Sequence, residues 1–180
     1  TGPGALVLNT ANTYGGSTVI SAGSLQVLNA TGSATGAGTV VVSSGAGLAG
    51  TGRITGPVQN SGSVAPGVSV GTMTLGSSYT QSVGGSFDVE IGGTAAGSQY
   101  DRLSITGAAT ISGTLNVMLV NGFLPSVGNT FDILTAGSRS GTFLTVNVPA
   151  LVAPRTWRVE YLATGVRLTD AALLIRNRPL

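Results

Sequence analysis

The sequence predicts an all-β protein: a parallel β-solenoid (β-helix) that leads into a C-terminal antiparallel, sandwich-like β region. Three observations support this fold class. Short strands that begin with Gly recur along most of the chain, apolar and polar residues alternate within them, and no helical period lasts for more than two turns. Such recurrence is typical of stacked β-coils, in which each coil buries its apolar face against its neighbours.

The Gly-led strands define the expected coils in chain order. They occupy residues 4–8, 23–27, 38–42, 71–75, 85–89 and 113–117. Gly at the start of a strand permits the positive φ that a sharp turn requires. The expected corner residues are Gly4, Gly23, Gly38, Gly71, Gly85 and Gly113. The alternating apolar positions give the expected core, which contains Leu6, Leu25, Val27, Phe87, Leu115, Val117 and Phe131.

The residue composition and the expected strand length change near residue 84. Residues 1–84 are rich in Gly and small side chains and are predicted to form the solenoid repeats, whereas residues 85–180 have longer strands and most of the aromatic residues. This boundary is soft, and one continuous unit is the alternative. Near the end of the chain, Thr164-Gly165 is predicted to form a tight hairpin turn, which would set Tyr161 opposite Leu168.

The composition excludes several classes of function. The chain has eight Arg and six acidic residues but no Lys, His or Cys. It therefore has no Ser-His-Asp triad, no catalytic Cys, no ordinary zinc site, no Walker-A lysine and no Schiff-base lysine. A net charge of +2 spread along the chain is not the basic stripe that binds nucleic acid. We expect no cofactor, no metal and no nucleic-acid partner.

The same composition favours a location outside the cell. With so few charges, the outer faces of the strands must carry Gly, Ser, Thr and Asn, which suits a secreted or surface protein. No apolar run approaches the roughly 18 residues of a membrane-spanning helix. The chain opens at Thr1-Gly2-Pro3-Gly4 without Met or an apolar leader, so we expect a mature or excised segment.

One stretch resembles a known repeat. Residues 4–27 read GALVLNTANTYGGSTVISAGSLQV: a Gly-led strand, Asn-Thr-Tyr, Gly, a Thr-Val strand and a second Gly-led strand. This order resembles the autotransporter-associated β-strand repeat of bacterial passenger domains. Residues 71–93 and 100–117 resemble the segment near the C-terminal end of such passengers. The resemblance implies export, a right-handed parallel β-helix, and an extracellular or bacterial cell-surface location.

Acidic residues are the first place to look for catalysis. Asp88 and Glu90 alternate with apolar residues and share the outer face of one strand, where two carboxylates could act as an acid/base pair or bind a cation. A solvated strand face is the favoured interpretation for this pair and for Asp132. A turn is the favoured interpretation for Asp101.

The arginines near the C-terminus allow two interpretations. Arg155, Arg158 and Arg167 could form a patch for an anionic polysaccharide. The favoured alternative is that they lie over the hairpin and pair with Glu160 and Asp170.

The first strand is the candidate self-association site. It consists of Ala5, Leu6, Val7, Leu8 and Asn9, within a stretch of 52 residues that carries no charge. The ends of stacked β-architectures are normally blunted by charge, Pro or a cap. Either more coils precede this strand or it pairs with another subunit. A head-to-tail contact that does not close would build a filament.

The predicted function is structural: a surface scaffold or a subunit of a self-assembling filament, with no enzymatic activity. The first alternative is a polysaccharide-binding adhesin module, which outward-facing Tyr14, Tyr79 and Tyr100 in a row would favour. The second is a β-helix carbohydrate-active enzyme, which would need clustered carboxylates together with Arg. The expected partners are further copies of the chain and, in the adhesin alternative, a polysaccharide.

Overall fold

A computed structural model describes residues 2 and 4–173, and this part of the chain contains β-strands, turns and loops but no helix. The strands are β1 (Ala5–Leu8), β2 (Thr18–Ile20), β3 (Gly23–Val27), β4 (Val40–Val42), β5 (Ala46–Gly50), β6 (Arg53–Ile54), β7 (Val58–Asn60), β8 (Ser63–Pro66), β9 (Thr72–Leu75), β10 (Tyr79–Gln81), β11 (Ser86–Ile91), β12 (Arg102–Ile105), β13 (Ala108–Ile111), β14 (Thr114–Leu119), β15 (Thr130–Thr135), β16 (Ser138–Gly141), β17 (Thr145–Asn147), β18 (Arg155–Leu162) and β19 (Gly165–Ala172).

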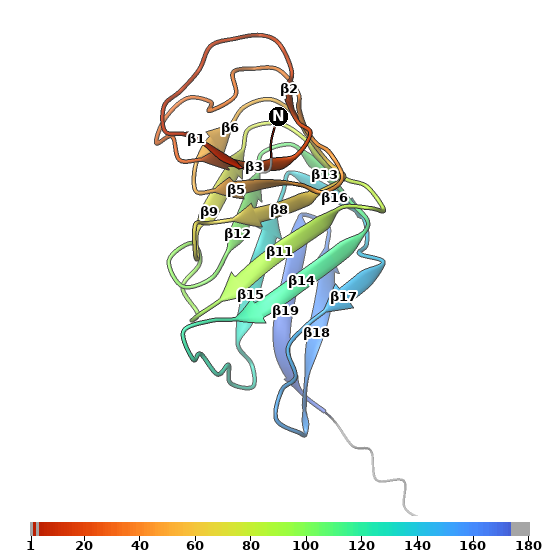
Figure 1. The fold of residues 1–180 in the computed structure, drawn as a ribbon. Coiled ribbons are helices and arrows are strands. Elements are labelled where there is room, and N and C mark those ends of the chain that lie inside the picture. Colours follow the sequence, from red (N-terminus) through yellow and green to blue (C-terminus); the bar gives the residue numbers. More distant parts are fainter. Residues whose placement is uncertain (1, 3, 174–180) are drawn as a thin grey trace, which may run out of the picture.

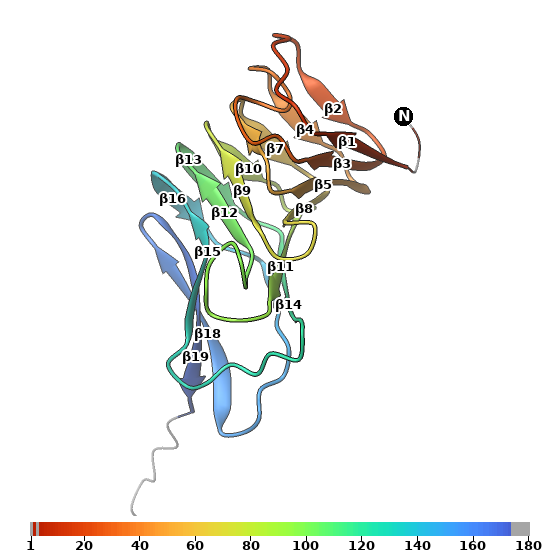
Figure 2. The ribbon, with the colours of Figure 1, turned by 90° about the vertical axis from the view of Figure 1, so that its left-hand side faces the viewer.

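The strands form three sheets, which we call A, B and C. Sheet A has the order β1-β3-β5-β8-β11-β14-β17, sheet B the order β16-β13-β10-β7-β4-β2, and sheet C the order β18-β19-β15-β12-β9-β6. From β5 onward the chain visits A, C and B in turn, and all pairs up to β17 are parallel. The coils therefore stack along one axis, with β1 at one end and the β18–β19 hairpin at the other (Figures 1 and 2). The predicted parallel β-solenoid is confirmed.

The first two coils contribute no strand to sheet C. In that position lie the loops that precede β2 and β4, which are dominated by small and polar residues. These loops nevertheless stack on each other and on β6. The amide of Asn12 donates to the carbonyl of Ser33 (2.8 Å), and the amide of Ala34 donates to the carbonyl of Arg53 (2.9 Å). Backbone hydrogen bonding thus continues through irregular segments up to the first coil.

One apolar column runs along the whole of sheet A. Its members, in register from coil to coil, are Leu6, Leu25, Leu48, Val64, Phe87, Leu115 and Val146. The expected core residues of the middle coils are all buried, namely Leu25, Val27, Phe87, Leu115, Val117 and Phe131. The expectation is wrong for Leu6, which is 61% exposed because it lies on the edge strand β1.

The expected corner glycines do not share one structural reason for being Gly. Only Gly23 and Gly113 have the positive φ that we expected at all six, with values of 68° and 66°. At Gly38 the reason for Gly is close packing between coils instead. A Cβ there would lie 2.1 Å from the carbonyl oxygen of Gly16 in the preceding coil, which no side chain tolerates.

The antiparallel C-terminal region is confirmed as a hairpin of β18 and β19, in which β19 also pairs antiparallel with β15. Details of the expected turn are wrong by one residue. Leu162 pairs with Gly165, so Tyr161 lies opposite Val166 and not opposite Leu168. The strands before this hairpin, up to β17, extend the parallel coils.

Strands from both sides of residue 84 lie in each of the three sheets. The division into residues 1–84 and 85–180 stays a prediction, and residues 174–180 of the second part lie outside the described residues. Within the described part of the chain, no helix has the length and hydropathy needed to cross a membrane.

Candidate self-association surface

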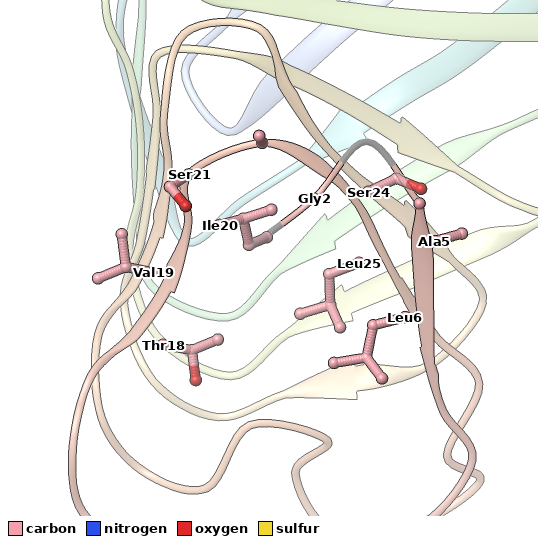
Figure 3. Close-up of a pocket in the computed structure, with 11 residues that line it drawn as sticks. Gly2, Ala5, Leu6, Thr18, Val19, Ile20, Ser21, Ser24 and Leu25 are labelled. Carbon is pink, nitrogen blue, oxygen red and sulfur yellow. The ribbon is translucent and has the colours of Figure 1, made fainter.

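The first coil leaves an apolar hollow open at the end of the solenoid. Its volume is about 370 Å³, and it is lined by Gly2, Gly4, Ala5, Leu6, Thr18, Val19, Ile20, Ser21, Ala22, Ser24 and Leu25. We call this set the N-terminal end surface. Leu6, Ile20 and Leu25 point toward the hollow, whereas Val19 points away from it (Figure 3). β1 and β2 are the edge strands of sheets A and B at this end.

Leu6 is exposed although it has the inward orientation of a core residue. It lies in register with Leu25, which is 3% exposed, and through Leu25 with Leu48, which is 1% exposed. The three side chains share one face, and only the outermost is uncovered. The exposure of Leu6 therefore follows from its place at the end of the stack and not from a polar environment.

The backbone of β1 also has a free edge. The carbonyls of Gly4 and Leu8 accept hydrogen bonds from the β3 side, from the amides of Ser24 (3.1 Å) and Leu28 (2.8 Å). Because successive peptide groups of a strand point to opposite sides, the polar backbone groups of Val7 face away from β3. An unpaired strand edge of this kind is a template for pairing with another strand.

The structure thus places the five predicted residues at one edge. Ala5, Leu6, Val7 and Leu8 form β1, and Asn9 follows it and is exposed. No titratable group lies within the first 52 residues, apart from the phenol of Tyr14. The surface can therefore act through apolar contact and backbone hydrogen bonding.

The opposite end of the core is closed by aromatic side chains. Phe143, which is 6% exposed, stacks on Phe87 with ring centroids 6.4 Å apart and contacts the ring of Tyr161 at 6.2 Å. The hydroxyl of Tyr161 accepts a hydrogen bond from the amide of Phe143 (3.2 Å). Burial raises the pKa of Tyr161 above its ordinary value, so the phenol stays neutral. We call Phe143, Tyr161 and the β18–β19 hairpin the C-terminal cap.

Ion pairs reinforce the C-terminal cap. Arg155 binds the fully buried carboxylate of Asp170, with Nε 3.0 Å from Oδ1, and Arg158 lies 3.0 Å from Glu160. Both pairings agree with the favoured interpretation of the arginines.

Arg167 instead pairs with a residue that was assigned to a solvated strand face. Its Nε lies 2.7 Å from Oδ1 of Asp132, which faces it across the β15–β19 pair. Each of the three arginines thus pairs with a carboxylate of its own, which argues against a patch of unpaired positive charge.

Asp88 begins a polar ladder that the sequence did not reveal. Its carboxylate accepts hydrogen bonds from the hydroxyls of Ser63 and Ser86 and from Nδ2 of Asn116 (2.6 Å), and Asn116 in turn accepts one from Nδ2 of Asn147 (2.8 Å). The ladder crosses successive strands on the outer face of sheet A. The separations of 28 and 31 residues correspond to one coil each. The sequence would have predicted these contacts only if the length of each coil had been known.

Asp101 was predicted to lie in a turn. It follows the turn at residues 97–99 and is buried, with 1% exposure. It accepts hydrogen bonds from the amides of Gly71 (2.7 Å) and Glu90 (2.8 Å). Burial raises the pKa of Asp101 to about 7, against the opposing effect of these two amides. The carboxyl group is thus engaged by backbone groups and fastens the chain after β11 to the turn before β9.

Asp88, Glu90 and Asp101 contribute to one hollow of about 240 Å³. The residues that line it include no Arg, which the carbohydrate-enzyme alternative required. In the described part of the chain, no cluster of three Asp, Glu, His or Cys side chains is arranged to hold a metal ion.

The three tyrosines do not form an outward row. Tyr14 is 43% exposed, but Tyr79 and Tyr100 are buried, with 1% and 4% exposure. Tyr79 donates its hydroxyl hydrogen to Gln81 (2.8 Å) within the core, and burial raises its pKa. This placement counts against a tyrosine-based sugar-binding face.

Comparison with protein families finds a similarity in the first part of the chain. Residues 1–27 match the family described as passenger-associated-transport-repeat. The resemblance to the repeat of autotransporter passengers is therefore confirmed over this stretch. No curated protein matches the chain. The matched residues include β1, β2 and β3, which form most of the N-terminal end surface. The molecule is thus a parallel β-solenoid in which residues 1–27 are similar to the passenger-associated repeat.

Proposed function

We propose that the chain is an extracellular structural module, a surface scaffold of stacked coils that assembles through its N-terminal end surface. The passenger-associated repeat supports a secreted or surface-exposed protein. The solenoid architecture supports a scaffold role, because each coil extends the molecule along one axis and offers an edge for further pairing.

The observation that carries the proposal is the 61% exposure of Leu6, which is the first member of the sheet A column and is followed by five buried members. Complete burial of a Leu side chain stabilises by about 1.5–3 kcal/mol, so covering the exposed part of Leu6 would contribute about 1–2 kcal/mol. Leu8 and Val7 lie on the same strand and would add to this contribution. A partner that supplies an apolar strand satisfies both the side chains and the free backbone edge.

We assign the module no reaction and no cofactor. Asp88 accepts hydrogen bonds from three neutral donors, and Asp101 is buried against two backbone amides, so both carboxyl groups already have hydrogen-bond partners within the fold. The net charge of +2 gives no reason to propose a nucleic-acid partner.

A polysaccharide-binding role is the second candidate, supported by one observation. The ladder of Asp88, Asn116 and Asn147 forms one side of a hollow of about 770 Å³ on the outer face of sheet A, together with Met118 and Val148. Amide and carboxylate groups can hydrogen-bond sugar hydroxyls. A glycan panel would test this role, with Asn116→Ala expected to abolish any binding found.

Light scattering of the purified chain tests the structural proposal. We expect the mass to rise above the 17.7 kDa of one chain as the concentration increases. Leu6→Glu would place an unpaired charge in the apolar hollow and is expected to keep the chain monomeric with an unchanged far-UV spectrum. Val83→Glu is the matched control, because Val83 is 74% exposed in a turn far from the end surface. A wild-type chain that stays monomeric at every concentration would overturn the proposal.

A further inference from the structure

Two hollows on the outer face of sheet A join into one elongated surface. The larger, of about 770 Å³, lies over β11, β14 and β17, and the smaller, of about 240 Å³, continues toward β8, β5 and β3, where Ala65 and Gln26 line it. Both hollows are lined by Asp88, Val89 and Met118. We call the two together the sheet A groove. Because these strands lie side by side (Figure 1), a ligand that fills the groove crosses several coils along the stacking axis.

The amide groups of the polar ladder have hydrogen-bonding capacity left over. An Asn side chain offers two N–H donors and an oxygen with two lone pairs. Asn147 uses one N–H on Asn116, and Asn116 uses one N–H on Asp88. Each amide therefore keeps one N–H, Asn116 keeps one lone pair, and the oxygen of Asn147 accepts no hydrogen bond from the described residues. Sugar hydroxyls, which both donate and accept, match this mixture of groups.

Apolar side chains lie beside the ladder. Met118 is 56% exposed and Val148 is 37% exposed, and both line the larger hollow together with Pro149. Binding sites for small molecules typically combine apolar surface with a few placed polar groups. A sugar ring has the same two aspects, because its C–H groups form apolar faces and its hydroxyls point outward from the edge.

The charges of the groove restrict the kind of sugar. Asp88 and Glu90 are among the described residues that line the two hollows, and none of these residues is Arg. The arginines of the C-terminal cap are paired with carboxylates of their own. A uronate or sulfate group in the groove would therefore meet charges of its own sign without a compensating cation. The groove suits a neutral glycan better than an acidic one.

We propose that the sheet A groove binds a neutral, extended, β-linked polysaccharide that lies along the stacking axis. This inference rests on the second candidate function, for which it names the class of glycan. Neighbouring strands lie about 4.8 Å apart, close to the length of one sugar in a cellulose-type chain, so successive sugars meet successive coils. Asn147 and Asn116 hydrogen-bond the hydroxyls, and Met118 packs against a ring face.

A pair of polymers with one backbone tests the proposed class. Hydroxyethyl cellulose is neutral and carboxymethyl cellulose is anionic, and the binding of each to the immobilised chain is measured by biolayer interferometry. We expect hydroxyethyl cellulose to bind and carboxymethyl cellulose to bind at least about tenfold more weakly, because of the like charges in the groove. Asp88→Asn, which removes one of these charges, is expected to raise the affinity for carboxymethyl cellulose.

Two variants locate the binding on the molecule. Asn147 is exposed on the edge strand β17, so Asn147→Ala should leave the fold intact and raise the Kd for cellohexaose about tenfold, as expected for a lost hydrogen bond. Gln59→Ala is the matched control, because Gln59 is an exposed amide on β7 in sheet B, and its Kd should not change.

The outcomes separate this inference from the functions proposed above. Binding of hydroxyethyl cellulose that Asn147→Ala weakens and Gln59→Ala does not supports the inference. It is overturned if hydroxyethyl cellulose does not bind, if carboxymethyl cellulose binds as tightly, or if Asn147→Ala binds like the unaltered chain. The glycan panel then decides whether the second candidate function holds for another class of sugar, and light scattering tests the scaffold proposal independently.

Discussion

Replacing Phe143 with Ala should show how strongly the C-terminal cap contributes to stability. Phe143 is 6% exposed and lies between the rings of Phe87 and Tyr161, at centroid distances of 6.4 and 6.2 Å. Its amide also donates to the hydroxyl of Tyr161. Removing the ring leaves a cavity at the end of the core and loses both ring contacts.

The expected loss follows from this burial. Phe→Ala substitutions in cores lower the free energy of unfolding by about 3–5 kcal/mol. For a chain of this size, each kcal/mol shifts Tm by roughly 2–4 °C, so Tm should fall by about 6–20 °C. Leu144→Ala is the matched control, because the neighbouring Leu144 is 68% exposed and should change stability by less than about 0.5 kcal/mol.

Urea unfolding monitored by far-UV circular dichroism would measure both variants, and amide hydrogen exchange would locate the change. In a stacked architecture each coil contacts only its neighbours, so the loss should speed exchange mainly in β16 to β19. Equal free energies of unfolding for Phe143→Ala and Leu144→Ala would refute the assignment of Phe143 to a cap.

Two further outcomes follow from the coils themselves. Gly113→Ala should destabilise the chain by at least about 1 kcal/mol more than Gly122→Ala in urea unfolding. Both glycines have similar positive φ, 66° and 67°. A Cβ at Gly113 would lie 2.2 Å from the carbonyl oxygen of Gly85, whereas a Cβ at Gly122 would have no atom within 4 Å. Equal losses of unfolding free energy in the two variants would contradict close packing between coils. For Asp101, burial raises the pKa to about 7 from an ordinary value of 3.8, so the folded chain holds a proton that the unfolded chain releases between these values. Stability should therefore fall as pH rises from about 4 to 7, and Asp101→Asn should flatten this dependence; a wild-type stability that rises over the same range would show that the two amide hydrogen bonds outweigh burial.

The sequence was sufficient to predict the fold class because each coil repeats the same local pattern of alternating apolar residues. Alternating apolar residues, as in Phe87, Val89 and Ile91, place one face inward, and this face is buried in the structure. The hairpin was also predictable from its turn, although its register was wrong by one residue. A two-residue loop is short, so a shift of one position in the turn changes the partner of Tyr161.

Contacts between coils could not be predicted, because they depend on the length of each coil. Asp88, Asn116 and Asn147 are separated by 28 and 31 residues, and only the stacked sheets show that they are neighbours. Asp101 was assigned to a turn because it follows an aromatic residue and precedes Arg102. Its burial arises from Gly71 and Glu90, which reach it from two different coils.

Leu6 was predicted as a core residue from the same alternation that correctly identified Leu25 and Phe87. Local pattern specifies which face a side chain takes, but only the neighbouring coils decide whether that face is covered. In a solenoid, the apolar face of the outermost coil at each end has no further coil to cover it. The two ends of the described chain differ in what covers this face. The C-terminal end is covered by aromatic rings and a charged hairpin of the same chain, whereas the first coil offers Leu6 and a free strand edge. The stretch that matches the passenger-associated repeat therefore includes the edge strand β1 and most of the N-terminal end surface.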